Sequence, residues 1–111
     1  MSLSTHVLDS SSGLPATGMA VRLERLSGSD WEPLAAAKTN SDGRITDWGP
    51  SVEVPPATYR LVFETSSYLV RQNLPVFFPE VTISFVITDG SRHHHVPLLL
   101  SPYAYSTYRG S

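Results

Sequence analysis

The sequence predicts an all-β sandwich with one short helix, and three observations support this fold class. Apolar and polar residues alternate with a period of two along most of the 111 residues, which is typical of half-buried strands. Clusters of Gly, Ser, Asp, Asn and Pro interrupt these runs every roughly 8–15 residues, as turns between short strands do. Nine prolines disfavour long helices. We therefore expect about seven or eight strands in a single domain over residues 1–111.

The first expected strand covers residues 3–9 and carries a histidine. Leu3, Thr5 and Val7 share one face of this strand, so His6 points to the opposite face. The Gly- and Pro-containing segment Ser11–Pro15 then predicts a turn.

Three later runs show the alternation most clearly. Their apolar positions are Met19, Val21 and Leu23, then Tyr59, Leu61 and Phe63, then Val81, Ile83, Phe85 and Ile87. Turn sequences lie between the runs, at Ser27–Asp30, Asn40–Gly43 and Asp89–Gly90. The one plausible helix spans about Thr65 to Gln72, where a Ser or Thr is available to cap its start.

Composition excludes several classes of partner and site. The formal charge is −2, from 8 basic and 10 acidic residues with no basic stripe, so nucleic acid and anionic membranes are poor partners. The chain has no cysteine, which excludes disulfides and thiolate metal sites and is compatible with the cytoplasmic location that we expect. The first residues lack the charged start and apolar run of a signal peptide, and no apolar run reaches transmembrane length.

Three consecutive histidines, His93, His94 and His95, precede the apolar run at residues 96–100. On a strand, His93 and His95 project to one face and His94 to the other. Such a pair is half of a zinc site that His6 could extend, but it could equally be a metal-free catalytic pair or a solvated strand end. The residue types leave these three alternatives open.

Two further residues carry weaker signals when each is taken alone. A single strand histidine such as His6 is usually structural or solvent-exposed. Arg44 follows the turn at residues 41–43, where an arginine is ordinarily a solvated surface charge.

Three segments, taken together, resemble one enzyme family. Residues 3–9 resemble the N-terminal motif of the 5-hydroxyisourate hydrolases, also called transthyretin-related proteins, and residues 31–34 with 38–44 resemble their central segment. Residues 95–111 are similar to their C-terminal signature over its whole length, including the final Tyr-Arg-Gly-Ser. The resemblance spans essentially the entire chain.

The resemblance implies a transthyretin-like sandwich of two four-stranded sheets with one short helix. It implies a homotetramer in which edge strands pair across subunits, two such dimers pack face to face, and substrate sites lie at the contact between dimers. The implied reaction is the hydrolysis of 5-hydroxyisourate to 2-oxo-4-hydroxy-4-carboxy-5-ureidoimidazoline in urate degradation, with neither cofactor nor metal.

Motif by motif, the resemblance assigns catalytic roles to His6, Arg44, His95 and Ser111, and substrate contact to Tyr108 with His6 and Arg44. A neutral histidine suits a base acting on water near neutral pH, although the residues do not decide between His6 and His95. Arg44 could stabilise negative charge on the attacked carbonyl oxygen, and Ser111 could orient an imidazole or the water. The family commonly has His-Tyr-His where this chain has His93, His94 and His95. The resemblance therefore leaves the roles of His93 and His94 open.

Three other interpretations compete with this one. A transthyretin-type binding protein for hormones or other aromatic ligands has the same fold, but transthyretin carries a lysine and a glutamate at the positions matching His6 and Arg44. Its tail also continues without Tyr-Arg-Gly-Ser. The other interpretations are a zinc hydrolase using His6, His93 and His95, and a purely structural sandwich.

Overall fold

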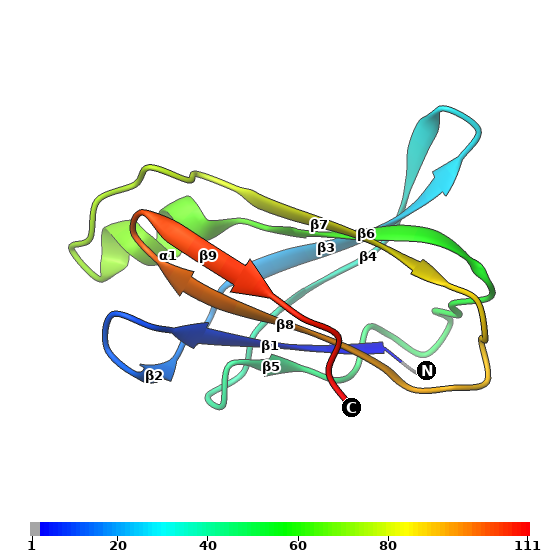
Figure 1. Ribbon diagram of the computed structural model, residues 1–111, viewed down its shortest axis with the longest axis horizontal. Coiled ribbons are helices and arrows are strands. Elements are labelled where there is room, and N and C mark those ends of the chain that lie inside the picture. The colour runs from blue at the N-terminus through cyan, green and yellow to red at the C-terminus, as the bar shows by residue number, and fades with distance from the viewer. Residues whose placement is uncertain (1–2) are drawn as a thin grey trace.

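The computed structural model describes residues 3–111, which form two facing sheets and one helix (Figure 1). The elements, in chain order, are β1 (Leu3–Asp9), β2 (Leu14–Pro15), β3 (Ala20–Ser27), β4 (Asp30–Lys38), β5 (Arg44–Ile45), β6 (Ala57–Phe63), α1 (Thr65–Arg71), β7 (Val81–Ile87), β8 (His94–Ser101) and β9 (Ala104–Thr107). The all-β class with one short helix is confirmed.

One sheet has four strands, as expected, and the other has five. The four-stranded sheet is antiparallel in the order β4-β3-β6-β7. In the other sheet the order is β2-β1-β8-β9, and β5 also pairs with β1. The fifth strand arises because β2 and β5, of two residues each, pair with successive parts of β1: β5 with Thr5–His6 and β2 with Leu8–Asp9. Strands this short carry no periodicity that a sequence could reveal.

The core lies between the two sheets and contains the alternating apolar residues. Those predicted on the inner faces of β3 and β6 are at most 1% exposed: Met19, Val21, Leu23, Tyr59, Leu61 and Phe63. On β1, Leu3, Thr5 and Val7 are fully buried, so the opposite face of β1 is the outer surface of the sandwich. That outer face carries His6.

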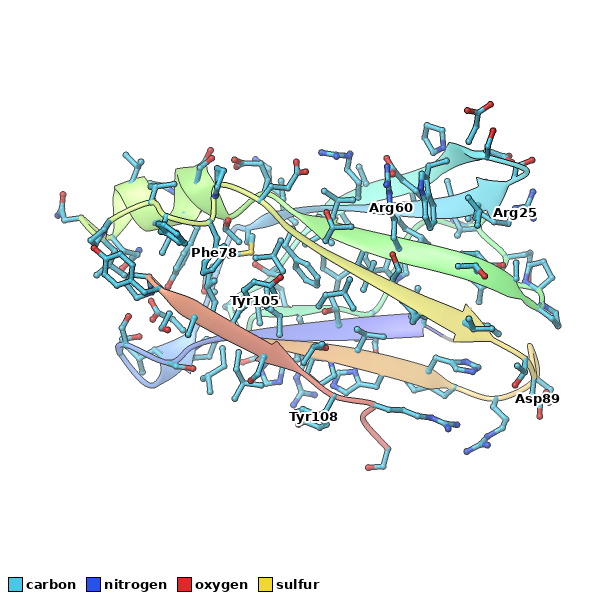
Figure 2. The ribbon with its side chains drawn as sticks, turned by 45° about the horizontal axis from the view of Figure 1, so that its top comes forward. Arg25, Arg60, Phe78, Asp89, Tyr105 and Tyr108 are labelled. Carbon is cyan, nitrogen blue, oxygen red and sulfur yellow. The ribbon has the colours of Figure 1, made fainter. Side chains whose placement is uncertain are left out.

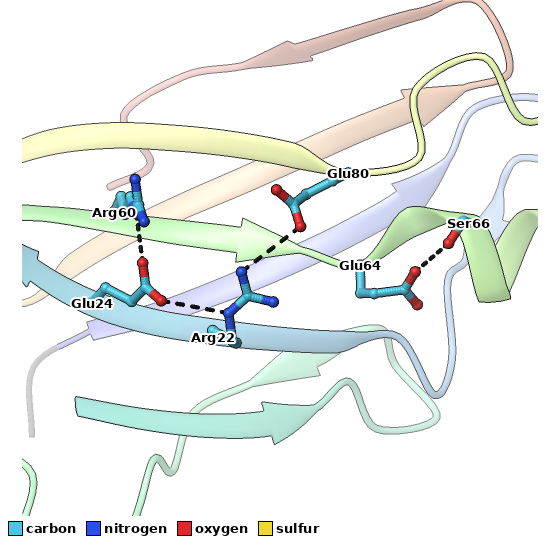
Figure 3. A network of polar contacts seen from close by, with 6 residues as sticks. All are labelled: Arg22, Glu24, Arg60, Glu64, Ser66 and Glu80. Atoms are coloured by element: carbon cyan, nitrogen blue, oxygen red, sulfur yellow. Dashed lines mark hydrogen bonds and ion pairs between the residues drawn. The ribbon is translucent and has the colours of Figure 1, made fainter. Parts of the chain in front are cut away.

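A polar network covers the outer face of the four-stranded sheet (Figure 3). Glu24 binds Arg60 at 2.6 Å and Arg22 at 3.5 Å, and Arg22 also reaches Glu80 at 3.7 Å. The Arg60 guanidinium lies 4.3 Å from the centre of the Trp31 ring. Glu24 is only 8% exposed although it lies on the outer face, because these side chains cover it.

The helix begins at Thr65, one residue earlier than it would if Thr65 were its N-cap. Its N-cap is Glu64, whose side chain accepts a hydrogen bond from the Ser66 hydroxyl (Figure 3) and another from the Ser67 N–H. The expected Ser or Thr cap is therefore wrong. Thr65 is instead the first residue of the helix, and its hydroxyl donates to the carbonyl of Phe78, 2.5 Å away. The hydrogen bond from Ser66 is the main reason why the pKa of Glu64 lies below its ordinary value.

A buried hydrogen bond fixes α1 to the end of β1. The Tyr68 hydroxyl donates to Asp9 at 2.7 Å, and the backbone N–H of Ser11 donates to the same carboxylate at 2.9 Å. Burial alone would raise the pKa of Asp9, but the hydrogen bond from the Ser11 hydroxyl, followed by those from Tyr68 and from the backbone, holds it below its ordinary value. Within residues 3–111, no helix is long and apolar enough to cross a membrane.

Candidate active site

The parallel pairing of β1 with β8 brings His6 and His95 to the same outer face. Ser4 is opposite His95 in the register, and His6 is opposite Pro97. Because side chains on one face recur every second residue, Ser4, His6 and His95 share the face opposite the core. His6 and His95 are therefore diagonal neighbours on adjacent strands, and both are half-buried.

A tight turn delivers Arg44 to the strand position directly opposite His6. The side chain of Asn40 accepts hydrogen bonds from the backbone of Asp42 at 2.9 Å and of Arg44 at 3.0 Å. Gly43 has a φ of +76°, and its carbonyl accepts a hydrogen bond from the N–H of Val7 at 2.8 Å. A Cβ on Gly43 would lie 2.5 Å from the carbonyl oxygen of Val7, so only glycine allows this approach.

Ser4 joins two histidines that are distant from it in the sequence. Its hydroxyl oxygen lies 2.9 Å from Nε2 of His93 and 2.7 Å from Nδ1 of His95. The prediction that His93 and His95 project to one face is confirmed, since both contact the same hydroxyl. Sequence reasoning missed Ser4 as part of this site. Its only signal was that it shares a strand face with His6, and the partners of that face depend on the register with β8.

His95 is held in its neutral form more strongly than an exposed histidine. Burial of its ring is the main cause that lowers the pKa of His95 below its ordinary value. Positive charges on His6, His93 and Arg44 lower the pKa further, and a hydrogen bond with the backbone of Ser4 partly opposes them. A neutral imidazole next to a permanent guanidinium charge can accept a proton from water near pH 7.

The tail runs alongside β8 beyond β9 and pairs with it again at His95. The N–H of Gly110 donates to the carbonyl of His95 at 2.8 Å, which forms an isolated bridge beyond β9. A Cβ on Gly110 would lie 2.4 Å from Cδ2 of His95, so this close approach also requires glycine. Tyr108, where the chain leaves β9 (Figure 2), and Ser111 are exposed. In the part of the chain that the structure describes, neither of these side chains hydrogen-bonds to His6, Arg44 or His95.

A cavity of about 300 Å³ lies beside the tail but does not contain the whole site. Its lining comes from β7, β8 and residues 107–109 and includes His95 and Tyr108, but neither His6 nor Arg44. Arg44 and Ser111 are exposed on the surface. The described chain therefore brings Ser4, His6, Arg44 and His95 to one face without enclosing them.

The zinc interpretation finds limited support in the donor set. Among residues 3–111, no group of three His, Cys, Asp or Glu side chains is arranged to hold a metal ion. Nε2 of His93 and Nδ1 of His95 both contact the hydroxyl of Ser4. The described side chains therefore do not supply the three or four ligands that a zinc ion needs.

Comparison with known proteins identifies the family. The model of the HIUase/Transthyretin family matches residues 3–110. The chain belongs to this family. The 5-hydroxyisourate hydrolase of Salmonella dublin is 45% identical over 109 residues, which cover 98% of this chain and 80% of that protein. The mouse (Mus musculus) 5-hydroxyisourate hydrolase is also 45% identical, and the match covers 98% of this chain and 94% of the mouse protein.

Solved structures from both branches of the HIUase/Transthyretin family share the fold. The Klebsiella pneumoniae 5-hydroxyisourate hydrolase superposes with a TM-score of 0.86 at 42% identity, covering 100% of each chain. Sea bream transthyretin, solved in complex with thyroxine, superposes with a TM-score of 0.92 at 28% identity, covering 99% of this chain and 95% of that one. Backbone shape thus does not separate the two branches, whereas sequence identity favours the hydrolases.

Proposed function

We propose that this protein hydrolyses 5-hydroxyisourate to 2-oxo-4-hydroxy-4-carboxy-5-ureidoimidazoline, a step of urate degradation. The observation that carries the proposal is the cross-strand pair of His6 and Arg44 beside His95, whose pKa is lowered. The high identity to proteins named as 5-hydroxyisourate hydrolases supports the choice of substrate. A single domain over residues 1–111 would carry the whole activity.

The site residues suit a simple hydrolytic mechanism. A neutral histidine takes a proton from water, and the water oxygen bonds to the ring carbonyl carbon. The C–N bond of the cyclic amide then breaks, and the leaving nitrogen receives a proton. Arg44 stabilises the negative charge on the carbonyl oxygen while that charge develops. We assign the catalytic roles to His6, Arg44, His95 and Ser111, and substrate contact to Tyr108 together with His6 and Arg44.

Enclosing the substrate requires a second surface over this face. His6 and Arg44 lie outside the cavity of the described chain, and Arg44 and Ser111 are exposed. A homotetramer, as a dimer of dimers, would cover the outer face of β1, β5 and β8 with the same face of another subunit. We place the enzyme in the cytoplasm, which cell fractionation tests.

The reaction as proposed needs neither metal nor cofactor. Proton transfer falls to histidines and charge stabilisation to Arg44, so no step requires a Lewis acid. A zinc hydrolase would instead lose its activity on chelation and regain it with zinc.

Transthyretin-type binding of an aromatic ligand is the second candidate function, and the superposition on sea bream transthyretin favours it. Two measurements separate the candidates. Freshly generated 5-hydroxyisourate should lose its absorbance faster with this protein than in buffer, and a calorimetric titration with thyroxine should give no saturable binding. Decay at the spontaneous rate together with saturable thyroxine binding would establish the carrier instead.

A further inference from the structure

The hydroxyl of Ser4 is a buried group between two imidazole rings. Ser4 is 5% exposed, and its oxygen contacts Nε2 of His93 and Nδ1 of His95 at 2.9 and 2.7 Å. A hydroxyl has one proton to donate and lone pairs to accept. For both contacts to be hydrogen bonds, one ring must therefore present an N–H to Ser4 while the other ring accepts from it.

The two contacts of Ser4 allow this chain of hydrogen bonds to run in either of two directions. If Ser4 donates to Nδ1 of His95, the proton of neutral His95 lies on Nε2, and that nitrogen cannot take a proton from water. If the N–H of His95 is at Nδ1 and faces Ser4, Nε2 is left free to act as the base that the proposed hydrolysis requires. In this second direction Ser4 accepts the N–H of His95 and donates its own proton to Nε2 of His93.

The other nitrogen of His95 then has a free lone pair. In neutral imidazole one nitrogen is a donor and the other an acceptor, so a proton on Nδ1 leaves Nε2 unprotonated. Within residues 3–111, Nε2 of His95 has no hydrogen-bond partner and is not a buried atom. It is therefore accessible to water.

We propose that Ser4 and His93 are positioning residues that hold His95 as its Nδ1–H tautomer, so that Nε2 accepts the proton of the attacking water. This inference rests on the hydrolysis proposed above and divides the work between the two histidines. The water O–H bond breaks toward Nε2, the water oxygen bonds to the carbonyl carbon, and Ser4 and His93 exchange no proton. His93 thereby gains a role that the family resemblance did not supply.

The charged and titratable groups that influence His95 come from each neighbouring segment. They are His6 on β1, Arg44 on β5, and His93 just before β8. The permanent positive charge of Arg44 disfavours a lasting imidazolium, which helps His95 pass its proton to the leaving nitrogen. The chain through Ser4 decides which nitrogen of His95 performs this transfer, and not how strongly His95 binds the proton.

The tautomer can be read directly from the ¹⁵N imidazole shifts of the full-length protein labelled at histidine. Wild type should show His95 protonated at Nδ1 above its pKa. In Ser4→Ala we expect a shift toward the Nε2–H form, because Nδ1 loses its acceptor. Ser101→Ala is the matched control: it removes a hydroxyl from β8 that donates only to the carbonyl of Ala104, so the spectrum of His95 should not change.

Kinetics supply the second readout. Ser4→Ala should lower kcat by about ten- to a hundredfold and leave KM nearly unchanged, because the base is present but carries its proton on the wrong nitrogen. His93→Phe should act in the same direction, since it frees the Ser4 proton to turn toward Nδ1 of His95. His93→Gln should retain most of kcat, because its amide oxygen can accept from Ser4.

Two results would overturn the inference. One is a wild-type His95 protonated at Nε2, and the other is a Ser4→Ala variant in which both the ¹⁵N shifts and kcat stay at wild-type values. If wild type itself does not accelerate hydrolysis, the proposed function fails, while the tautomer measurement still tests the hydrogen-bond chain. Should Ser4→Ala not fold, the two His93 variants decide, because His93 is exposed and outside the core.

Discussion

At the scale of single residues, the site depends on a few side chains whose environment changes their chemistry. His95 is half-buried on the outer face of β8, where burial and nearby positive charges lower its pKa. Arg44 is exposed and looks like an ordinary solvated surface charge. Only its position opposite His6 in the sheet indicates a role in the site. The first two predictions concern these residues.

Reversing the charge of Arg44 should abolish most of the turnover. Losing one aimed electrostatic contact costs about 3–4 kcal/mol, and Arg44→Glu adds repulsion to that loss, so the rate should fall by about a hundredfold or more. Arg44→Lys should be intermediate, since it keeps the charge and loses the planar fork. Turnover, Tm and oligomer size should be measured for both. Lys38→Glu, an equal charge change at an exposed site at the end of β4, is the control. Near-normal turnover of a folded Arg44→Glu protein would exclude Arg44 from the site.

The pH dependence should report the neutral form of His95. Because its folded pKa lies below its ordinary value of about 6.5, kcat/KM should be level above that pH and fall on acidification with a midpoint below it. The unfolded chain takes up the proton first, so the free energy of unfolding should decrease as the pH falls from 6.5 toward the folded pKa. His94→Gln should leave the acid limb in place, since His94 faces away from Ser4 and the candidate site. A midpoint above 6.5 would contradict this account.

At the scale of elements, the alternating runs predicted the long strands well. The inner positions of β3, β6 and β7 followed from period two because one buried face determines every second residue. The helix cap at Glu64 and the two-residue strands β2 and β5 could not be predicted in this way, since contacts distant in the sequence decide them. Ser4 was missed for the same reason.

The turn before β5 provides a prediction with a matched control. Gly43 and Gly13 both have a φ of +76°, but a Cβ would meet the Val7 carbonyl oxygen only at Gly43 and would have nothing within 4 Å at Gly13. Gly13→Ala should cost about 1–2 kcal/mol of unfolding free energy from the left-handed backbone alone. Gly43→Ala should cost more and also reduce turnover, because it displaces Arg44. Urea unfolding and turnover assays would check this, and equal costs at the two glycines would refute the role of the close approach.

The tail should be needed for turnover and largely dispensable for stability. Residues 109–111 add one backbone bridge to β8 and bury little surface, so deleting them should leave Tm nearly unchanged. Turnover should be lost, because Ser111 and the segment that pairs with His95 disappear together. Gly110→Ala, which forces a Cβ against the His95 ring, should lower turnover with the tail still present. A truncated protein with normal turnover would remove Ser111 from the catalytic set.

At the scale of the whole molecule, the sequence predicted the sandwich and the resemblance implied which face matters. The faces of His6, His93 and His95 followed from strand periodicity, whereas their proximity depended on the parallel register of β1 with β8. Register between the two ends of a chain has no local signal in the sequence. The subunit assembly is harder still to predict, because the pattern of a single chain does not show which surface of another subunit covers the exposed Arg44.

The proposed assembly predicts a solution mass of about four times the 12.2 kDa chain. Light scattering coupled to gel filtration, at the protein concentration of the assay, measures this mass directly. A tetramer would close the open face over His6 and Arg44. A fully active monomer would contradict the proposal that the site is completed between subunits.

The central claim is that this fold hydrolyses 5-hydroxyisourate with its own side chains, and one measurement tests it most directly. Freshly generated 5-hydroxyisourate is mixed with exhaustively chelated protein, and its absorbance is followed against buffer and against His95→Gln. We predict rapid loss of absorbance with the chelated wild type and a rate near that of buffer with folded His95→Gln. Decay of the substrate at the spontaneous rate with wild type, or activity that returns only when zinc is added, would contradict the account.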